Sequence, residues 1–228
     1  MARIAEDLLL LLLDNASARP GLDRARRERV LAAAALLDLA HACRIRPAID
    51  GEPVQAGRLM VLSGPPPDDR VLAPALQLLL RRPISPATAI ARLRSETPAA
   101  VFAQLERDGQ IRRVRLQRNG IRGIKPTYAW PLIDRARVSQ ARAALMSTLF
   151  DEQRPAPTTA AIISLLYLID GLGAVLSLSE RGWEWVSSRA GDIAGGGWVG
   201  DCEPGLAEVN LAVTTAAIRP VLTDHIRR

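Results

Sequence analysis

The chain has 228 residues, of which 48% are hydrophobic and 24% are charged, and its formal net charge is +6. This composition excludes a disordered chain, and the presence of only two cysteines and two histidines excludes a disulfide scaffold, a zinc ribbon and most histidine-based metal sites. Because aromatic residues make up only 4%, aliphatic and alanine side chains must fill the core, which favours helices.

The first part of the chain predicts two helices and a short β-like region. The segment Ala2–Leu13 is leucine-rich on nearly every side, which indicates a helix in the centre of the core. Asp23 can cap a second helix that runs to about Arg44. Asp38 lies in the apolar half of this helix, where we expect a buried, hydrogen-bonded structural carboxylate. Two β-like stretches follow, at Arg44–Ile49 and Arg58–Leu62.

The middle of the chain predicts three helices and then a β-hairpin. The helices are expected at Arg70–Arg81, Pro86–Arg94 and Pro98–Asp108. After them, Gln110–Leu116 alternates apolar and basic residues, and Asn119-Gly120 is a strong signal for a two-residue hairpin turn. The chain then returns over Ile121–Tyr128, so the predicted hairpin spans about residues 110–128.

The last part of the chain predicts three longer helices, at about Ile133–Phe150, Thr158–Leu178 and Leu206–Thr223. A glycine- and tryptophan-rich loop is expected between the last two, at Gly182–Gly205. Thr158–Leu178 has the length of a membrane span, but Asp170-Gly171 interrupts it, so we interpret it as a buried core helix. Acidic residues flank the apolar run Leu8–Leu13, which does not fit an export signal. We therefore expect a soluble cytoplasmic chain.

These elements predict a mainly α fold: one multi-helix domain over residues 1–228 with a protruding basic hairpin. The whole net charge is concentrated in the segment Arg107–Lys125. Its seven cations are Arg107, Arg112, Arg113, Arg115, Arg118, Arg122 and Lys125, and its one anion is Asp108. Such a patch indicates a polyanionic partner, which can be a membrane headgroup, a nucleic acid or an acidic protein.

No catalytic constellation is apparent in the sequence. It contains no G-x-G-x-x-G, no Walker loop, no H-E-x-x-H and no G-x-S-x-G motif. His41 and Cys43 lie two residues apart on a predicted helix, so they point to different faces and make a poor pair of ligands or nucleophiles. We therefore expect a protein that is not an enzyme and that carries no cofactor and no metal.

The basic hairpin leaves three interpretations open. A helix followed by a basic hairpin at Pro98–Tyr128 is typical of the last helix and wing of a winged helix-turn-helix protein, with the arginines on DNA phosphates. A peripheral membrane protein would instead lay the same hairpin on anionic headgroups. The third interpretation is a solvated hairpin whose charge protects an exposed edge from aggregation.

Six spaced segments decide between these interpretations when they are taken together. They are IAEDLLLLLLD at Ile4–Asp14, ALLDLAHACRI at Ala35–Ile45, LERDGQI at Leu105–Ile111, PTYAWPL at Pro126–Leu132, TAAIISLLYLID at Thr159–Asp170 and EVNLAVTTAAI at Glu208–Ile218. In this order they resemble the Golgi phosphoprotein 3 family (the GPP34 domain) in its bacterial branch. The resemblance covers nearly the whole chain and makes the winged helix the second choice.

The resemblance implies a mainly helical domain with a protruding hairpin that is associated with membrane contact and oligomerisation. It also implies a peripheral membrane protein, since eukaryotic members recognise phosphatidylinositol 4-phosphate. Their pocket uses a tryptophan and three arginines, and the matching positions here are Asp23, Ala32, Ser95 and Pro98. None of the four carries the family's residue, so neighbouring arginines would have to rebuild an anion site.

We therefore expect a non-enzymatic protein at the inner face of the membrane that binds anionic phospholipid, with headgroups similar to phosphatidylinositol 4-phosphate. The candidate headgroup ligands are Arg26, Arg29, Arg92 and Arg94. The candidate membrane contacts on the hairpin are Arg112, Arg113, Arg115, Arg118, Ile121, Arg122, Ile124 and Lys125. The hairpin is also a candidate surface for a homo-oligomer, and no nucleic-acid partner is expected. The alternatives are a winged-helix DNA-binding protein using residues 98–128 and an oligomeric scaffold without polyanion affinity.

Overall fold

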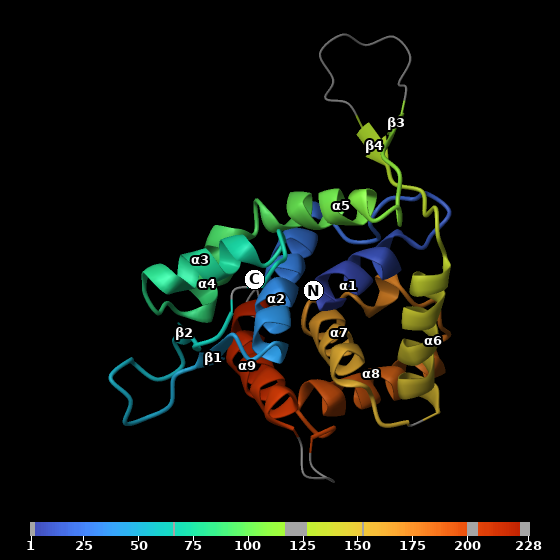
Figure 1. Ribbon diagram of the computed structural model, residues 1–228. Helices are drawn as coiled ribbons and strands as arrows, with labels where there is room; N and C mark the ends of the chain where they lie inside the picture. The colour runs from blue at the N-terminus through green and yellow to red at the C-terminus, as the bar shows by residue number, and fades with distance from the viewer. Residues whose placement is uncertain (1–2, 66, 117–126, 152, 200–204, 224–228) are drawn as a thin grey trace.

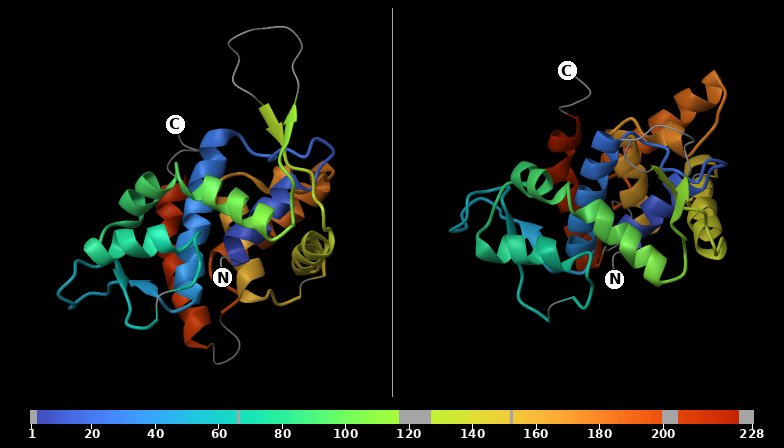
Figure 2. Two further views of the ribbon diagram at one scale, coloured as in Figure 1. Left: turned by 45° about the horizontal axis from the view of Figure 1, so that its top comes forward. Right: turned by 90° about the horizontal axis from the view of Figure 1, so that it is seen from above.

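The computed structural model describes residues 3–65, 67–116, 127–151, 153–199 and 205–223. It is mainly helical, as predicted, with two small antiparallel strand pairs (Figure 1). Both views in Figure 2 place α3, α4 and the β1–β2 pair at one end of the body and α6 at the other, with α1 and α2 between them. The bounds of these elements are Arg3–Leu13 (α1), Arg24–His41 (α2), Ile45–Pro47 (β1), Leu59–Val61 (β2), Ala73–Arg81 (α3), Pro86–Leu93 (α4) and Ala136–Phe150 (α6).

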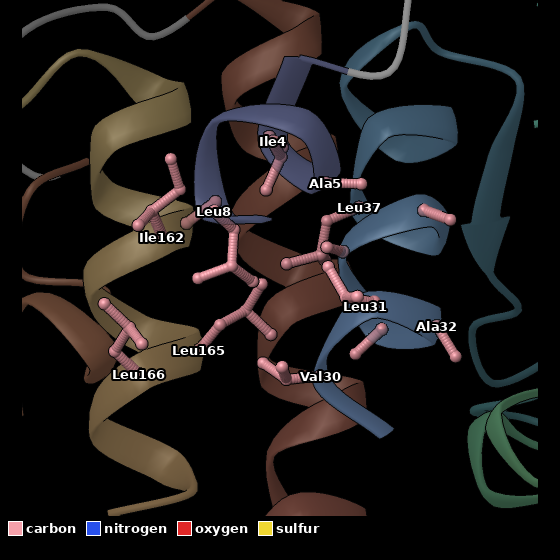
Figure 3. Packing of buried hydrophobic residues seen from close by; sticks show 14 of the residues in the cluster. Ile4, Ala5, Leu8, Val30, Leu31, Ala32, Leu37, Ile162, Leu165 and Leu166 are labelled. Carbon is pink, nitrogen blue, oxygen red and sulfur yellow. The ribbon is translucent and has the colours of Figure 1, made fainter. Parts of the chain in front are cut away.

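Helix α1 is the central element of the core. Its leucines pack on every side because other helices surround it, and Figure 3 shows Leu8 between the side chains of α2 and those of α7 (Pro157–Leu168). Asp38 on α2 is buried and accepts hydrogen bonds from the backbone N–H groups of Ile4 (2.9 Å) and Ala5 (3.0 Å). These bonds satisfy free donors at the beginning of α1. The predictions of a central first helix and of a structural Asp38 are therefore confirmed.

Helix α2 begins where the sequence predicts. The Asp23 side chain accepts a hydrogen bond from the backbone N–H of Arg26 and caps the helix. The second half of α2 is completely buried, as its run of alanines and leucines requires. The helix ends at His41, slightly earlier than predicted, because Cys43 adopts a left-handed backbone (φ 51°) and the chain turns into β1.

Each of the three helices that follow β2 has a proline in its first turn. Pro86 is the first residue of α4, and Pro74 and Pro98 are the second residues of α3 and α5 (Thr97–Arg107), at positions that need no backbone N–H. The hairpin follows as β3 (Val114–Leu116) and β4 (Thr127–Ala129), with Val114 opposite Ala129. Figure 1 shows β3 and β4 projecting away from the helical body, beside α5.

Two predictions in the last third of the chain are wrong. The helix expected at Thr158–Leu178 ends at Leu168, because Asp170 takes a left-handed backbone (φ 52°) and a short 3-10 helix, η1 (Leu172–Ala174), follows. The loop expected at Gly182–Gly205 contains a regular helix, α8 (Glu180–Ala194). Burial of Val186, Ala190 and Ile193 on one face stabilises α8 despite its glycines.

Helix α9 (Leu206–Thr223) closes the fold, as predicted. It packs mainly against α2 and α7, and Asn210 attaches it to the body by donating hydrogen bonds to the carbonyls of Ala40 (2.6 Å) and Ile45 (2.7 Å). Salt bridges join α6 to the central helix at Arg137, which contacts Glu6 (2.7 Å) and Asp7 (2.6 Å). Over the described ranges, no helix combines the length and the apolar character needed to cross a membrane.

Candidate functional site

The described part of the hairpin presents its arginines to solvent. Arg112, Arg113 and Arg115 are all exposed, and the structure forms no ion pair between them and an acidic side chain within the described ranges. The Arg113 guanidinium lies 3.8 Å from the centre of the Tyr128 ring on the opposite strand, a cation–π contact. The other predicted hairpin contacts (Arg118, Ile121, Arg122, Ile124 and Lys125) lie outside the described residues.

An aromatic cluster attaches the hairpin to the helical body. Trp130 follows β4, and its ring lies 4.4 Å from the Phe102 ring on α5 and 6.2 Å from the Tyr128 ring. Its backbone N–H also donates a hydrogen bond to the carbonyl of Ala18 in the loop before α2 (2.7 Å). These contacts hold the hairpin base close to both α5 and the beginning of α2.

A cleft of about 410 Å³ lies where α2, α5 and the hairpin base meet. We call it the hairpin cleft. Its cations are Arg24, Arg27 and Arg113, and its carboxylates are Glu28 and Glu106. The remaining lining residues are apolar or small: Ser95, Pro98, Ala99, Phe102, Ala103 and Trp130. The cleft thus combines an excess of positive charge with an aromatic wall.

Arg27 is a half-buried cation of the cleft that forms no ion pair within the described residues. Its guanidinium is half-buried, its Nε has no hydrogen-bond partner, and one Nη donates only a long bond to the carbonyl of Leu22 (3.5 Å). Burial lowers the pKa of Arg27, and the nearby Glu28 carboxylate opposes this shift. Glu28 itself forms a salt bridge with Arg24 (2.5 Å). A bound anion would compensate the cost of withdrawing the Arg27 guanidinium from water.

The four headgroup candidates chosen from the sequence do not line the hairpin cleft. Arg26 forms a salt bridge with Asp23 and donates to the carbonyl of Asp170 (3.1 Å), because it faces the end of α7. Arg29 is half-buried, and its Nε has no partner. Burial lowers the pKa of Arg29, and repulsion from Arg94 adds to this shift. Arg92 and Arg94 are exposed at the end of α4.

The helical period explains this division of the arginines. Arg24 and Arg27 are three residues apart and face the cleft together, whereas Arg26 and Arg29 form a second such pair on another face of α2. From the sequence, Arg26 and Arg29 were selected as headgroup ligands, and Arg24 and Arg27 were not. A helical wheel separates the two pairs, but only the position of the hairpin shows which pair borders a cleft. In the described part of the chain, no group of His, Cys, Asp and Glu side chains is arranged to hold a metal ion.

Comparison with known protein families agrees with this architecture. Residues 4–208 match the family model of Golgi phosphoprotein 3 (GPP34). The chain belongs to the Golgi phosphoprotein 3 family. A search of curated proteins found no match. Membership of the Golgi phosphoprotein 3 family is consistent with a non-enzymatic, membrane-associated protein that binds phospholipid.

The structure locates the four positions that were matched to the headgroup pocket of eukaryotic members. Ser95 and Pro98 line the hairpin cleft. Asp23 caps α2, and Ala32 is completely buried. Two of these four positions therefore border the hairpin cleft, whose cations are Arg24, Arg27 and Arg113.

Proposed function

We propose that this protein binds anionic phospholipid at a membrane surface without catalysing a reaction. In this proposal the hairpin arginines make the first contact, and the hairpin cleft receives a headgroup phosphate. The observation that carries the proposal is the half-buried Arg27, which has no ion pair within the described residues, in a cleft beside the exposed Arg113. Guanidinium groups bind phosphate oxygens through paired hydrogen bonds, so Arg24, Arg27 and Arg113 suit a phosphorylated headgroup.

The arrangement of the hairpin supports attachment from one side of the molecule. Figure 1 shows that the hairpin leaves the body on the side where α5 crosses the beginning of α2, so the hairpin and the cleft can face the same surface. Each cation near an anionic leaflet contributes about 1 kcal/mol, and Tyr128 and Trp130 are residue types that favour the interface. Anionic lipid is concentrated in the cytoplasmic leaflet, so we place the protein at the inner face of the membrane.

Vesicle flotation tests the proposal with charge-matched variants. Wild type should float with vesicles of phosphatidylcholine that contain phosphatidylserine or phosphatidylinositol 4-phosphate, and not with phosphatidylcholine alone. The triple variant Arg112→Glu, Arg113→Glu, Arg115→Glu should lose at least about 100-fold in binding, because three attractive charges become repulsive. A control with the same change in charge, Arg81→Glu, Arg82→Glu, Arg181→Glu, should bind like wild type because these exposed arginines lie outside the hairpin face.

A variant of the cleft separates headgroup recognition from simple charge attraction. Arg27→Met should lower binding to phosphatidylinositol 4-phosphate more than binding to phosphatidylserine at equal vesicle charge. Equal flotation of wild type and the hairpin triple variant would overturn the proposal, as would equal losses in both triple variants. Displacement of the protein from vesicles by duplex DNA, with tighter binding to the duplex, would favour the winged-helix alternative instead.

A further inference from the structure

Every exposed position of α9 carries an apolar side chain. Its exposed residues are Leu206, Val209, Val213, Ala216 and Pro220, and we call this set the α9 stripe. The three largest keep 76% (Leu206), 37% (Val209) and 46% (Val213) of their surface in contact with solvent. The exposed face of α8, in contrast, is largely charged, since it includes Glu180, Arg181, Glu184 and Asp192. Contiguous exposed apolar surface of this kind is typical of an interaction site.

The spacing of the α9 stripe is that of a helix–helix seam. Its residues follow one another at intervals of three, four, three and four, which places them on one line along the helix. The side chains are small apart from Leu206, so a second helix can approach closely. Asn210 fixes the rotation of α9 through its two buried hydrogen bonds, and the stripe therefore cannot turn inward without breaking them.

The charges beside the stripe are arranged symmetrically about its centre. Glu208 lies five residues before Val213 and Arg219 lies six residues after it, both half-buried and on the same flank of the helix. In an antiparallel pair of identical helices, the same flanks face each other across the two-fold axis. Glu208 then approaches the partner's Arg219, and Leu206 lies opposite the partner's Pro220. Neither Glu208 nor Arg219 forms an ion pair inside the described part of the monomer. One Nη of Arg219 donates a hydrogen bond to the carbonyl of Ala194 at the end of α8, so only the other N–H groups of its guanidinium can meet a partner's carboxylate.

We propose that the α9 stripe is the interface of a homodimer, in which two copies of α9 pack antiparallel about a two-fold axis at Val213. A second copy fits better than a bilayer for two reasons. Figure 1 places β3 and β4 at the top of the molecule and the beginning of α9 at the bottom, so the first turn of α9 lies far from the hairpin. Helices that lie on membranes also carry many lysines and arginines on their polar face, whereas α9 carries only Arg219. One helix pair covers less than the about 800 Å² per partner of a standard interface, so we expect a weak, reversible dimer.

Cysteine cross-linking tests the geometry of this pair. In a background of Cys43→Ser and Cys202→Ser, Val213→Cys should give a disulfide-linked dimer, because residue 213 meets its own copy at the axis. Leu206→Cys should not, since antiparallel packing separates the two copies of residue 206 by about 21 Å along the axis. Efficient cross-linking at both positions would indicate parallel helices and would overturn the proposal, as would cross-linking at neither.

Sedimentation over a range of concentrations tests the association itself. Val213→Glu should weaken the dimer at least about 100-fold, because it places two carboxylates against each other at the axis. Leu80→Glu, which changes another exposed leucine on α3 (56% exposed) in the same way, should sediment like wild type. The hairpin triple variant should also remain dimeric, so the result is independent of lipid binding. A wild type that stays monomeric at about 100 μM, or equal effects of Val213→Glu and Leu80→Glu, would overturn the proposal.

Discussion

The hairpin face and the α9 stripe are both open to solvent, and they differ in how they can be recognised. The hairpin face presents Arg112, Arg113 and Arg115 around a cleft in which positive charge exceeds negative charge. The α9 stripe presents only apolar side chains at helical spacing. A charged face attracts a partner from a distance and is weakened by salt, whereas an apolar seam depends on close contact. The difference teaches that one small chain can carry two contact surfaces that respond to different conditions.

Salt should separate the two surfaces by the largest amount. Raising the salt concentration from about 0.1 M to about 1 M shortens the Debye length from about 10 Å to about 3 Å. Binding to anionic vesicles should then fall at least about 100-fold, while the dimer dissociation constant should change less than about threefold because apolar burial is not screened. Flotation and sedimentation in the same buffers measure the two effects. A parallel loss of both would show that the dimer also depends on charge.

Removing the side chain that orients α9 should have the next largest effect. Asn210→Ala leaves the carbonyls of Ala40 and Ile45 buried without their donor and should lower the free energy of unfolding by about 2–3 kcal/mol. The dimer should weaken as well, because the stripe is no longer held outward. Denaturant unfolding measures the first effect and sedimentation the second.

Thr214→Val is the matched control on the same helix. Thr214 is completely buried and its hydroxyl has no hydrogen-bond partner in the described structure, so valine should be neutral or stabilising. Vesicle binding should be unchanged in both variants while the protein is folded. If Thr214→Val were as destabilising as Asn210→Ala, the two hydrogen bonds of Asn210 would not be the cause.

A change of pH should alter the stability of the protein and should leave vesicle binding and dimerisation unchanged. Burial raises the pKa of Asp38 from 3.8 to about 8, against the opposing effect of the backbone N–H groups of Ile4 and Ala5. A carboxyl with a raised pKa binds its proton more tightly in the folded state, so stability falls as pH rises between 3.8 and about 8. Wild type should therefore unfold at a lower temperature at pH 8 than at pH 6, and Asp38→Asn should show a flatter profile. A wild-type profile without this slope would mean that the two N–H groups keep Asp38 charged.

Much of the fold could be predicted because local signals agreed with the packing. The leucines of α1 predicted a central helix, Asp23 predicted the beginning of α2, and the alternation in Gln110–Leu116 predicted the first strand of the hairpin. The turn predicted at Asn119-Gly120 lies outside the described residues. Helix α8 could not be predicted in the same way, since its glycines and tryptophans are typical of loops. Only contact with α7 and the core shows that Val186, Ala190 and Ile193 form a buried face.

One part of the candidate site could likewise be predicted from the sequence, and the other could not. The basic hairpin was evident from charge alone, because the segment Arg107–Lys125 holds the whole net charge of the chain. The hairpin cleft was not evident from the sequence, because it forms only where Arg27 from α2 lies close to Phe102 from α5 and Trp130 from the hairpin base. These residues are far apart in the sequence, and no local pattern predicts that they meet.

By itself, therefore, the sequence determined the helical class of the protein, its family and the place where its charge is concentrated. Tertiary structure decided which arginines of α2 face the hairpin and which side of α9 stays outside. The physical reason is that composition and period are properties of one segment, whereas exposure depends on what the rest of the chain covers. Val213 shows this most clearly: its helix was predicted correctly, but only the burial of Leu211, Thr215 and Ile218 against the rest of the chain leaves it in solvent.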